Sequence, residues 1–263
     1  MSRRATRKSR NQLMGGHQRC WVWGRHAVRE ILQAGRWPVM ELLLADTLTD
    51  ELDADFRTLA NTRAVDVSAE SPKRLSQLCG VKNHQGVIAK MPPFPYDVAK
   101  EVLQAAADQP LFVMLDRIQD SYNFGAILRS AEVLGVDGVF IGDMHQAEVN
   151  SLVARTSGGA VNHLKIAQVP DLVEWTQSLR QSGHQIVGAS EKADRSPSDC
   201  NFQPATTLII GNEGEGIRPE LQELCNGLIA IPQCGQVGSL NAAVAAGILL
   251  YEARRQRNEV VSK

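Results

Sequence analysis

The segment TTLIIGNEGEGI, residues 206–217, carries the pattern that decides the fold. Residues 206–210 form the kind of apolar, β-branched run that makes a strand buried on both faces, and a glycine-rich loop follows directly. Similar runs alternate along the chain with segments of helical periodicity. This alternation predicts an α/β fold with a mostly parallel sheet covered on both faces. The predicted strands are residues 111–118, 138–142, 163–169, 185–190, 206–213 and 227–232.

The glycine-rich loop is a candidate ligand site, because ligands of such sheets bind beyond the carboxyl ends of the strands. Gly211, Gly214 and Gly216 surround Asn212 and Glu213, so the backbone there can approach a ligand closely. The G-x-x-G-x-G spacing differs from the dinucleotide fingerprint, and no Gly-Lys-Ser/Thr follows as in a P-loop. Two acidic residues in the loop disfavour a pyrophosphate. The loop therefore predicts a ligand with a positive centre, although a plain glycine-rich turn also fits it.

Two further segments place polar residues just after predicted strands. In DSYNFGAILRS, residues 120–130, Asn123 stands at a strand-to-helix turn and Arg129 one helical turn later, where both can face a substrate. In IPQCGQVGSLNAAVAAGI, residues 231–248, Ser239 is expected to cap a long alanine-rich helix. Its small residues allow close packing of another backbone, a nucleoside or a second subunit. Taken alone, an ordinary cap or a solvated arginine explains each segment equally well.

The first part of the chain predicts a smaller α/β unit. Helical and strand patterns alternate from Trp21, with a helix expected over residues 50–61 and another starting at Ser71 as N-cap and Pro72 as first helical residue. PPFPYD, residues 92–97, interrupts regular structure and marks a boundary. We predict a basic arm at 1–20, a small domain at 21–91, a linker with a first helix at 92–108 and a larger domain at 109–263.

Composition and charge narrow the class of protein. With 263 residues, 43% hydrophobic and 22% charged, the chain is an ordinary globular one, neither disordered throughout nor a collagen or disulfide scaffold. Residues 1–91 hold 15 Lys and Arg against 9 Asp and Glu, whereas the remainder holds 13 against 20. The basic arm either attracts a polyanion such as RNA or is merely a solvated tail.

No feature of the sequence predicts a membrane span, a secretory signal or a metal site. The apolar run at residues 242–251 is about half of the roughly 20 residues that a spanning helix needs. The basic N-terminus is followed by no apolar stretch, so we expect a cytoplasmic protein. Five cysteines without a C-x-x-C pair predict reduced thiols and neither a disulfide set nor a zinc site.

Taken together and in order, NFGAILR, IIGNEGEGI and IPQCGQVGSLNAAVAAGI resemble the three signature motifs of SPOUT-class RNA 2′-O-ribose methyltransferases of the TrmH type. GRHAVREIL and VKNHQGVIA resemble the ribosomal-protein-like α/β domain of the RlmB-like subgroup, which acts on large-subunit rRNA. The resemblance implies an RNA-binding domain at 21–91 and a trefoil-knotted methyltransferase domain at 109–263. It also implies S-adenosylmethionine bound in the knot, and a homodimer whose interface includes the last helix.

The resemblance carries roles over to individual positions. Family members commonly have Met and Ser where this chain has Gln233 and Ala243, which we expect to alter cofactor packing. The positions implied for catalysis and substrate are Asn123, Arg129, Glu213, Ser239 and Asn241. Those implied for the cofactor are Gly211, Asn212, Gly214, Gly216, Ile231, Ser239 and Leu240.

The implied reaction is transfer of a methyl group from S-adenosylmethionine to a ribose 2′-hydroxyl in RNA. A guanosine in large-subunit (23S-type) rRNA is the first choice of substrate, and a tRNA loop is the second. Two other classes stay open. A non-catalytic RNA-binding or ribosome-assembly factor would share the fold, and an NAD-dependent oxidoreductase would share the α/β class but lacks its fingerprint here.

Overall fold

The computed structural model describes residues 20–236 and 238–261. The predicted basic arm therefore lies almost wholly outside the described residues. The chain divides into two compact units, one of residues up to Pro95 together with Val149–Asn162, the other of Tyr96–Glu148 and His163 onward. Among the described residues, no helix combines the length and the apolar character that crossing a membrane requires.

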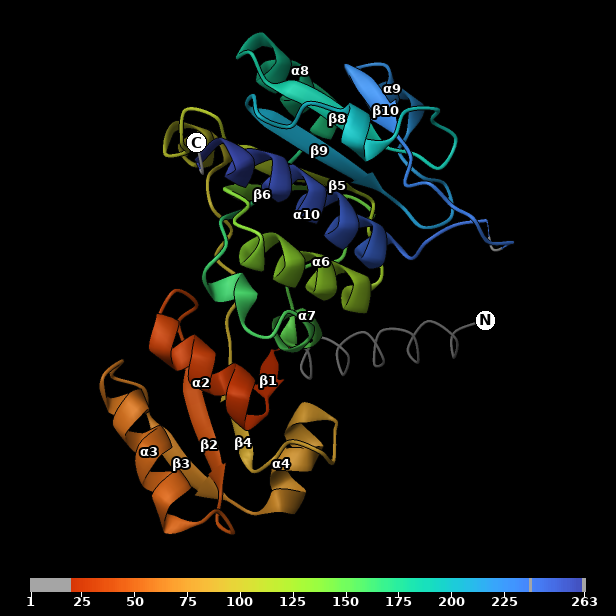
Figure 1. The fold of residues 1–263 in the computed structure, drawn as a ribbon. Helices are drawn as coiled ribbons and strands as arrows, with labels where there is room; N and C mark the ends of the chain where they lie inside the picture. Colours follow the sequence, from red (N-terminus) through yellow and green to blue (C-terminus); the bar gives the residue numbers. More distant parts are fainter. Residues whose placement is uncertain (1–19, 237, 262–263) are drawn as a thin grey trace, which may run out of the picture. The chain divides into compact units, whose positions relative to one another are not determined.

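The first unit is built on a four-stranded mixed sheet (Figure 1). Its strand order is β1-β4-β2-β3, with β2 and β3 parallel and the other two pairs antiparallel. The predicted helix over residues 50–61 is confirmed, as is the Ser71 cap, whose side chain accepts a hydrogen bond from the Arg74 N–H. The strands are β1 Trp21–Trp23, β2 Glu41–Ala45, β3 Val67–Glu70 and β4 Val87–Lys90, and the helices are α2 Arg25–Ala34, α3 Asp50–Asn61 and α4 Pro72–Cys79.

Side chains of this sheet alternate between two buried faces, as the pleat of a strand requires. Leu43 and Ile88 pack with Leu75 of α4. Leu42 and Leu44 are fully buried and, by the same alternation, lie on the opposite face. The core of the unit therefore lies on both sides of the sheet.

A segment distant in sequence completes the first unit. α7 (Ser151–Thr156) packs against β1, and η1 (Ala160–Asn162) packs against α2. The Arg155 guanidinium lies 4.7 Å from the centroid of the Trp23 ring, and Arg36 donates to the Val161 carbonyl at 3.3 Å. This segment belongs by sequence to the predicted 109–263 domain, and periodicity alone contains no signal for these contacts.

The second unit confirms the predicted parallel sheet. Its six strands are all parallel, in the order β10-β8-β9-β5-β6-β7, so β5 and β9 are neighbours at its centre. Both are near-continuous apolar runs because both of their faces are buried. The strands are β5 Leu111–Asp116, β6 Gly138–Gly142, β7 Ile166–Val169, β8 Gln185–Ala189, β9 Thr206–Gly211 and β10 Gly227–Ile229.

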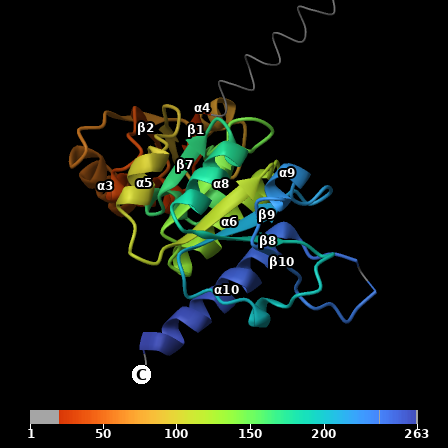
Figure 2. The same ribbon diagram turned by 90° about the horizontal axis from the view of Figure 1, so that it is seen from above.

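Helices cover both faces of this sheet. α6 and α10 lie side by side on one face (Figure 1). α5, α8 and α9 share the core cluster on the other face, and Figure 2 shows α8 across the strands. The helices are α5 Ala99–Gln104, α6 Ser121–Val133, α8 Leu172–Gln181, α9 Pro219–Gln222 and α10 Ala242–Val261, with the 3-10 turn η2 at Pro197–Asp199. The residues after the glycine-rich loop predict a helix over 218–225, but α9 starts at Pro219 and ends at Gln222, because Leu224 and Cys225 donate to carbonyls only three residues back.

Candidate active site

The loop after β9 is organised by Asn212. Its Oδ1 accepts hydrogen bonds from the backbone N–H groups of Gly214 at 2.8 Å and Glu215 at 3.2 Å, and its Nδ2 donates to the Arg117 carbonyl at 2.9 Å. Its backbone is paired with Gly216 in both directions. One side chain thus closes the loop on itself and ties it to the end of β5.

Gly211 is required by this closure. A Cβ atom there would lie 2.2 Å from the carbonyl carbon of Gly216 and 2.3 Å from the Ile217 nitrogen. Gly214 differs, because a Cβ would meet only Asn212 Oδ1, at 3.5 Å. The first glycine therefore allows the loop to fold, and the second leaves open space beside it.

An ion-pair cluster that sequence reasoning missed holds the far end of the loop. Asp116, fully buried at the end of β5, accepts from the Arg218 backbone N–H and Nε, both at 2.8 Å, and lies 2.6 Å from its terminal nitrogen. Arg117, with a left-handed φ of 61°, reaches Glu215 at 2.6 Å. The detectable signal was a carboxylate closing an apolar strand, because a buried charge needs a partner.

Three of the predicted catalytic residues form one hydrogen-bonded chain. Asn123 Nδ2 donates to Glu213 Oε1 at 2.6 Å, and Asn123 Oδ1 accepts from Asn241 Nδ2 at 2.9 Å. Asn123 itself is fixed at the start of α6, where its N–H bonds the N-cap Asp120. The three signature segments therefore meet at the carboxyl end of the sheet.

The cap expected at Ser239 is wrong. α10 begins at Ala242, and Asn241 Oδ1 accepts from the N–H groups of Ala243 at 2.9 Å and Val244 at 3.3 Å. Asn241 holds this place because its amide oxygen reaches the two N–H groups that a helix start leaves unpaired. Ser239 is exposed and lines the neighbouring cavity instead.

A cavity of about 310 Å³ opens beside this chain of residues. Hydrophobic side chains such as Ile210, Leu228 and Leu249 line it, together with the carboxylates of Glu191 and Glu215. All the positions that the sequence assigned to the cofactor line this one cavity, namely Gly211, Asn212, Gly214, Gly216, Ile231, Ser239 and Leu240. Its size and its mixture of apolar wall and few polar groups are those of a small-molecule site.

The donor set fits a nucleoside that carries a positive charge. Apolar walls suit an adenine ring, and Glu191, Glu213 and Glu215 suit a cationic centre, with Lys192 as the single basic lining residue. Phosphate-binding features are lacking from the described lining, which has no Gly-Lys-Ser/Thr turn. The residues present are therefore compatible with S-adenosylmethionine, and Gln233 also lines the cavity.

Arg129 stands apart from the hydrogen-bonded chain. It lies on α6 two turns after the helix start, and its side chain is exposed. Within residues 20–236 and 238–261 it forms no hydrogen bond or ion pair. Its exposed guanidinium is available to an anionic partner.

Comparison with known proteins decides the family. Residues 110–251 match the SpoU rRNA Methylase family, and residues 21–97 match a domain described as RNA 2′-O ribose methyltransferase substrate binding. The chain belongs to the SpoU family of RNA 2′-O-ribose methyltransferases. The resemblance to TrmH-type enzymes is confirmed, and the SpoU match alone spans more than half of the chain.

Three similar proteins illustrate the relationship. YacO of Bacillus subtilis, named a TrmH family tRNA/rRNA methyltransferase, is 34% identical over 92% of this SpoU chain and 98% of its own. The 23S rRNA (guanosine-2′-O-)-methyltransferase RlmB of Ralstonia nicotianae is 32% identical over 91% of this chain and 97% of its own. The crystal structure of the SpoU methyltransferase AviRb from Streptomyces viridochromogenes, in complex with the cofactor AdoMet, has a TM-score of 0.77 at 31% identity and covers 91% of this chain and 90% of its own.

Proposed function

We propose that this SpoU methyltransferase methylates the 2′-hydroxyl of a guanosine in large-subunit (23S-type) rRNA. The observation that carries the proposal is the Asn123–Glu213–Asn241 chain, which lies beside a cavity of nucleoside size. S-adenosylmethionine would supply an electrophilic methyl group there. Gly211, Ile231 and Leu240 are the residues that we expect to hold it, chiefly through their backbone groups.

The protein's own contribution is positioning. Bringing two reactants to within about 3 to 3.5 Å can supply several kcal/mol of acceleration. We assign Asn123, Glu213 and Asn241 to fixing the ribose and the loops around it. Arg129 would clamp the neighbouring phosphate bidentately and stabilise the developing oxyanion. A guanidinium is a poor general base, because it keeps its proton throughout the working pH range of proteins.

The first unit provides the main support for rRNA as the substrate. The match to a substrate-binding domain at residues 21–97, and relatives such as RlmB that align over nearly their whole length, favour rRNA. The name of YacO covers both tRNA and rRNA, so a tRNA loop is the second candidate. Sequence-specific RNA recognition favours unpaired loops of either molecule. Because rRNA and the methyl donor meet in the cytoplasm, we place the reaction there.

We further propose that the protein acts as a homodimer through α10. Val244, Ile248 and Tyr251, spaced like one face of a helix, are 51%, 40% and 62% exposed. An exposed apolar stripe of this kind is typical of an interface. Sedimentation should give a dimer, and Ile248→Glu should yield monomers. A wild-type protein that is monomeric at micromolar concentration would refute this part.

Titration with S-adenosylmethionine and with NAD tests the chemistry. We expect calorimetric binding of the methyl donor and none of NAD. Mapping 2′-O-methyl groups in total RNA from cells with and without the gene then identifies the nucleotide. A site lost from tRNA instead of rRNA would change the substrate. Failure to bind the donor at all would leave only a non-catalytic RNA-binding or ribosome-assembly role.

A further inference from the structure

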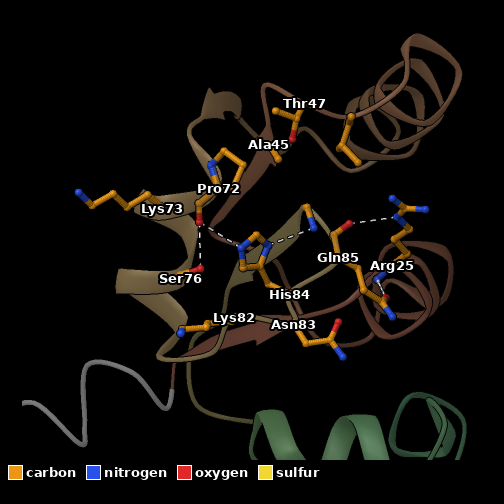
Figure 3. Close-up of a pocket in the computed structure, with 12 residues that line it drawn as sticks. Arg25, Ala45, Thr47, Pro72, Lys73, Ser76, Lys82, Asn83, His84 and Gln85 are labelled. Atoms are coloured by element: carbon orange, nitrogen blue, oxygen red, sulfur yellow. Dashed lines mark hydrogen bonds between the residues drawn. The ribbon is translucent and has the colours of Figure 1, made fainter.

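A second cavity lies in the first unit, between the start of α2, the start of α4 and the loop before β4 (Figure 3). Its volume is about 460 Å³, which is within the range of small-ligand sites. Three cationic side chains, those of Arg25, Lys73 and Lys82, line it, and no carboxylate does. Figure 3 shows Lys73 and Lys82 on one side of the central His84 and Arg25 on the other.

This charge is local, because residues 20–91 taken together carry no excess of basic residues. Of the 15 basic residues in 1–91, six lie in residues 1–19, which leaves nine against nine acidic residues in 20–91. Acidic side chains gather elsewhere, as at the first turn of α3, where Asp50, Glu51 and Asp53 stand. Lys73 and Lys82 make no ion pair with any residue that the structure describes. The cavity therefore concentrates unpaired positive charge on a neutral domain.

The loop that forms one wall is held in an unusual conformation. Gln85 has φ 57° and Gly86 has φ 79°. Gln85 is exposed, so burial of its side chain does not offset the cost of this left-handed backbone. Arg25 fixes it twice, since its backbone N–H donates to Gln85 Oε1 and its Nε to the Gln85 carbonyl, both at 3.0 Å. Left-handed non-glycine residues cost free energy and occur preferentially at functional sites.

His84 fixes the same loop from the other side. Its Nδ1 accepts from the Gly86 N–H at 3.0 Å, so its Nε2 carries the proton that bonds the Pro72 carbonyl at 3.1 Å. The neutral imidazole thereby ties the loop to α4, and it is almost fully buried. The wall is built before any ligand arrives, which reduces the entropy lost on binding.

The rest of the lining suits a nucleobase. Ala45, Leu48 and Pro72 supply an apolar surface, and the side chain of Asn83 is exposed above it. Neither the Asn83 amide nor Gln85 Nε2 is hydrogen-bonded to another described residue. The Asn83 amide offers both a donor and an acceptor, and Gln85 Nε2 offers a further donor, which is what reading the edge of an unpaired base requires.

We propose that this cavity holds one unpaired nucleotide of the RNA substrate, away from the methylated ribose. The phosphate lies against Lys73 and Lys82, and the base contacts Leu48 and Pro72. This inference rests on the proposed RNA methyltransferase function. The apolar surface, the Asn83 amide and Gln85 Nε2 together favour a nucleotide over a phosphopeptide, because a phosphopeptide would use only the cations.

The test uses the full-length protein and fluorescence anisotropy with a short single-stranded oligoribonucleotide of mixed sequence and with a fully paired RNA hairpin. The variant Lys73→Ala/Lys82→Ala is matched by Arg74→Ala/Lys100→Ala, which removes the same charge from exposed side chains outside the cavity. We expect the first variant to bind the single strand about 10-fold more weakly, with the log–log salt slope reduced by about 0.7 per lost phosphate contact. The affinity of the matched variant for the single strand, and the affinity of either variant for the hairpin, should change by less than about 2-fold.

Asn83→Ala should alter the relative affinities for oligoadenylate, oligouridylate and oligocytidylate and leave the salt slope unchanged. The proposal would be overturned if the two double variants lost the same affinity for the single strand. It would also be overturned if the Lys73→Ala/Lys82→Ala variant lost the same affinity for the single strand and for the hairpin. Weakened binding of a phosphoserine peptide with unchanged binding of RNA would overturn it as well. Calorimetry with S-adenosylmethionine separates the two claims. If the Lys73→Ala/Lys82→Ala variant methylates RNA and binds it as tightly as the wild type does, only the nucleotide site is refuted. If the protein fails to bind the donor but the variants lose RNA affinity as expected, only the enzymatic function is refuted.

Discussion

Asn123 donates its side-chain amide to Glu213 at 2.6 Å across 90 positions of sequence. The same amide accepts from Asn241 at 2.9 Å, so one side chain joins the start of α6, the loop after β9 and the start of α10. The asparagine amide carries its donor and its acceptor on separate atoms, so it can serve both partners at once. One side chain therefore holds together the three segments that we propose to position the substrate.

Replacement of Asn123 should lower the rate of methyl transfer more than the affinity for the methyl donor. In Asn123→Asp the acceptor for Asn241 survives, but a second carboxylate faces Glu213, so the loops separate. We expect a loss of about 100-fold in kcat, because small misplacements cost that much. Single-turnover kinetics measure the rate and calorimetry the donor affinity. Glu132→Gln, on the same helix, is the control, and equal effects of the two changes would contradict the positioning role.

Arg129→Ala should reduce methyl transfer by about 100-fold or more, since a group that stabilises developing charge is lost. Arg129→Lys keeps the charge but not the bidentate geometry, so we expect intermediate activity at every pH. The measurement is the rate of RNA methylation for both variants across pH. A lysine variant that shows a new, lower kinetic pKa and recovers its rate at high pH would establish a general base at this position instead.

Two glycines of one loop should respond differently. Gly211→Ala places a methyl group 2.2 Å from the Gly216 backbone and should destabilise the protein by about 1 to 3 kcal/mol. Gly214→Val meets only Asn212 Oδ1 near its Cβ and should keep the melting temperature while blocking the cavity. Thermal unfolding, donor calorimetry and RNA anisotropy separate the two, with RNA affinity largely unchanged for Gly214→Val. Unaltered donor binding by that variant would refute the location of the cofactor site.

Stability should fall at acidic pH through His184. Burial lowers the pKa of this imidazole, which stacks on Phe112 with ring centroids 5.4 Å apart. The unfolded chain therefore takes up the proton at a higher pH than the folded chain does. The contribution of His184 to the free energy of unfolding is complete above the unfolded pKa of about 6.5 and is lost as pH falls below it. His184→Phe keeps the stack and should flatten this dependence. Urea midpoints between about pH 8 and pH 5 measure it, and an unchanged slope would exclude His184 as the cause.

Much of the architecture was predictable because strand and helix periodicity are local properties. The parallel sheet, α3 and the Ser71 cap follow from apolar runs and cap chemistry within a few residues of each position. The glycine pattern around residues 211–216 likewise marked the loop that lines the cavity. The roles assigned to individual site residues stay predictions until the variants are measured.

The amino-acid order alone indicates which residues form strands, helices and glycine-rich turns, since burial pattern and backbone preference act over short distances. The contacts between those segments became visible with the folded structure. It paired Asp116 with Arg218, gave the α10 cap to Asn241 instead of Ser239, and joined Val149–Asn162 to the first unit. The Asp116–Arg218 pair and the packing of Val149–Asn162 depend on how whole faces meet, a quantity that no local window of sequence contains.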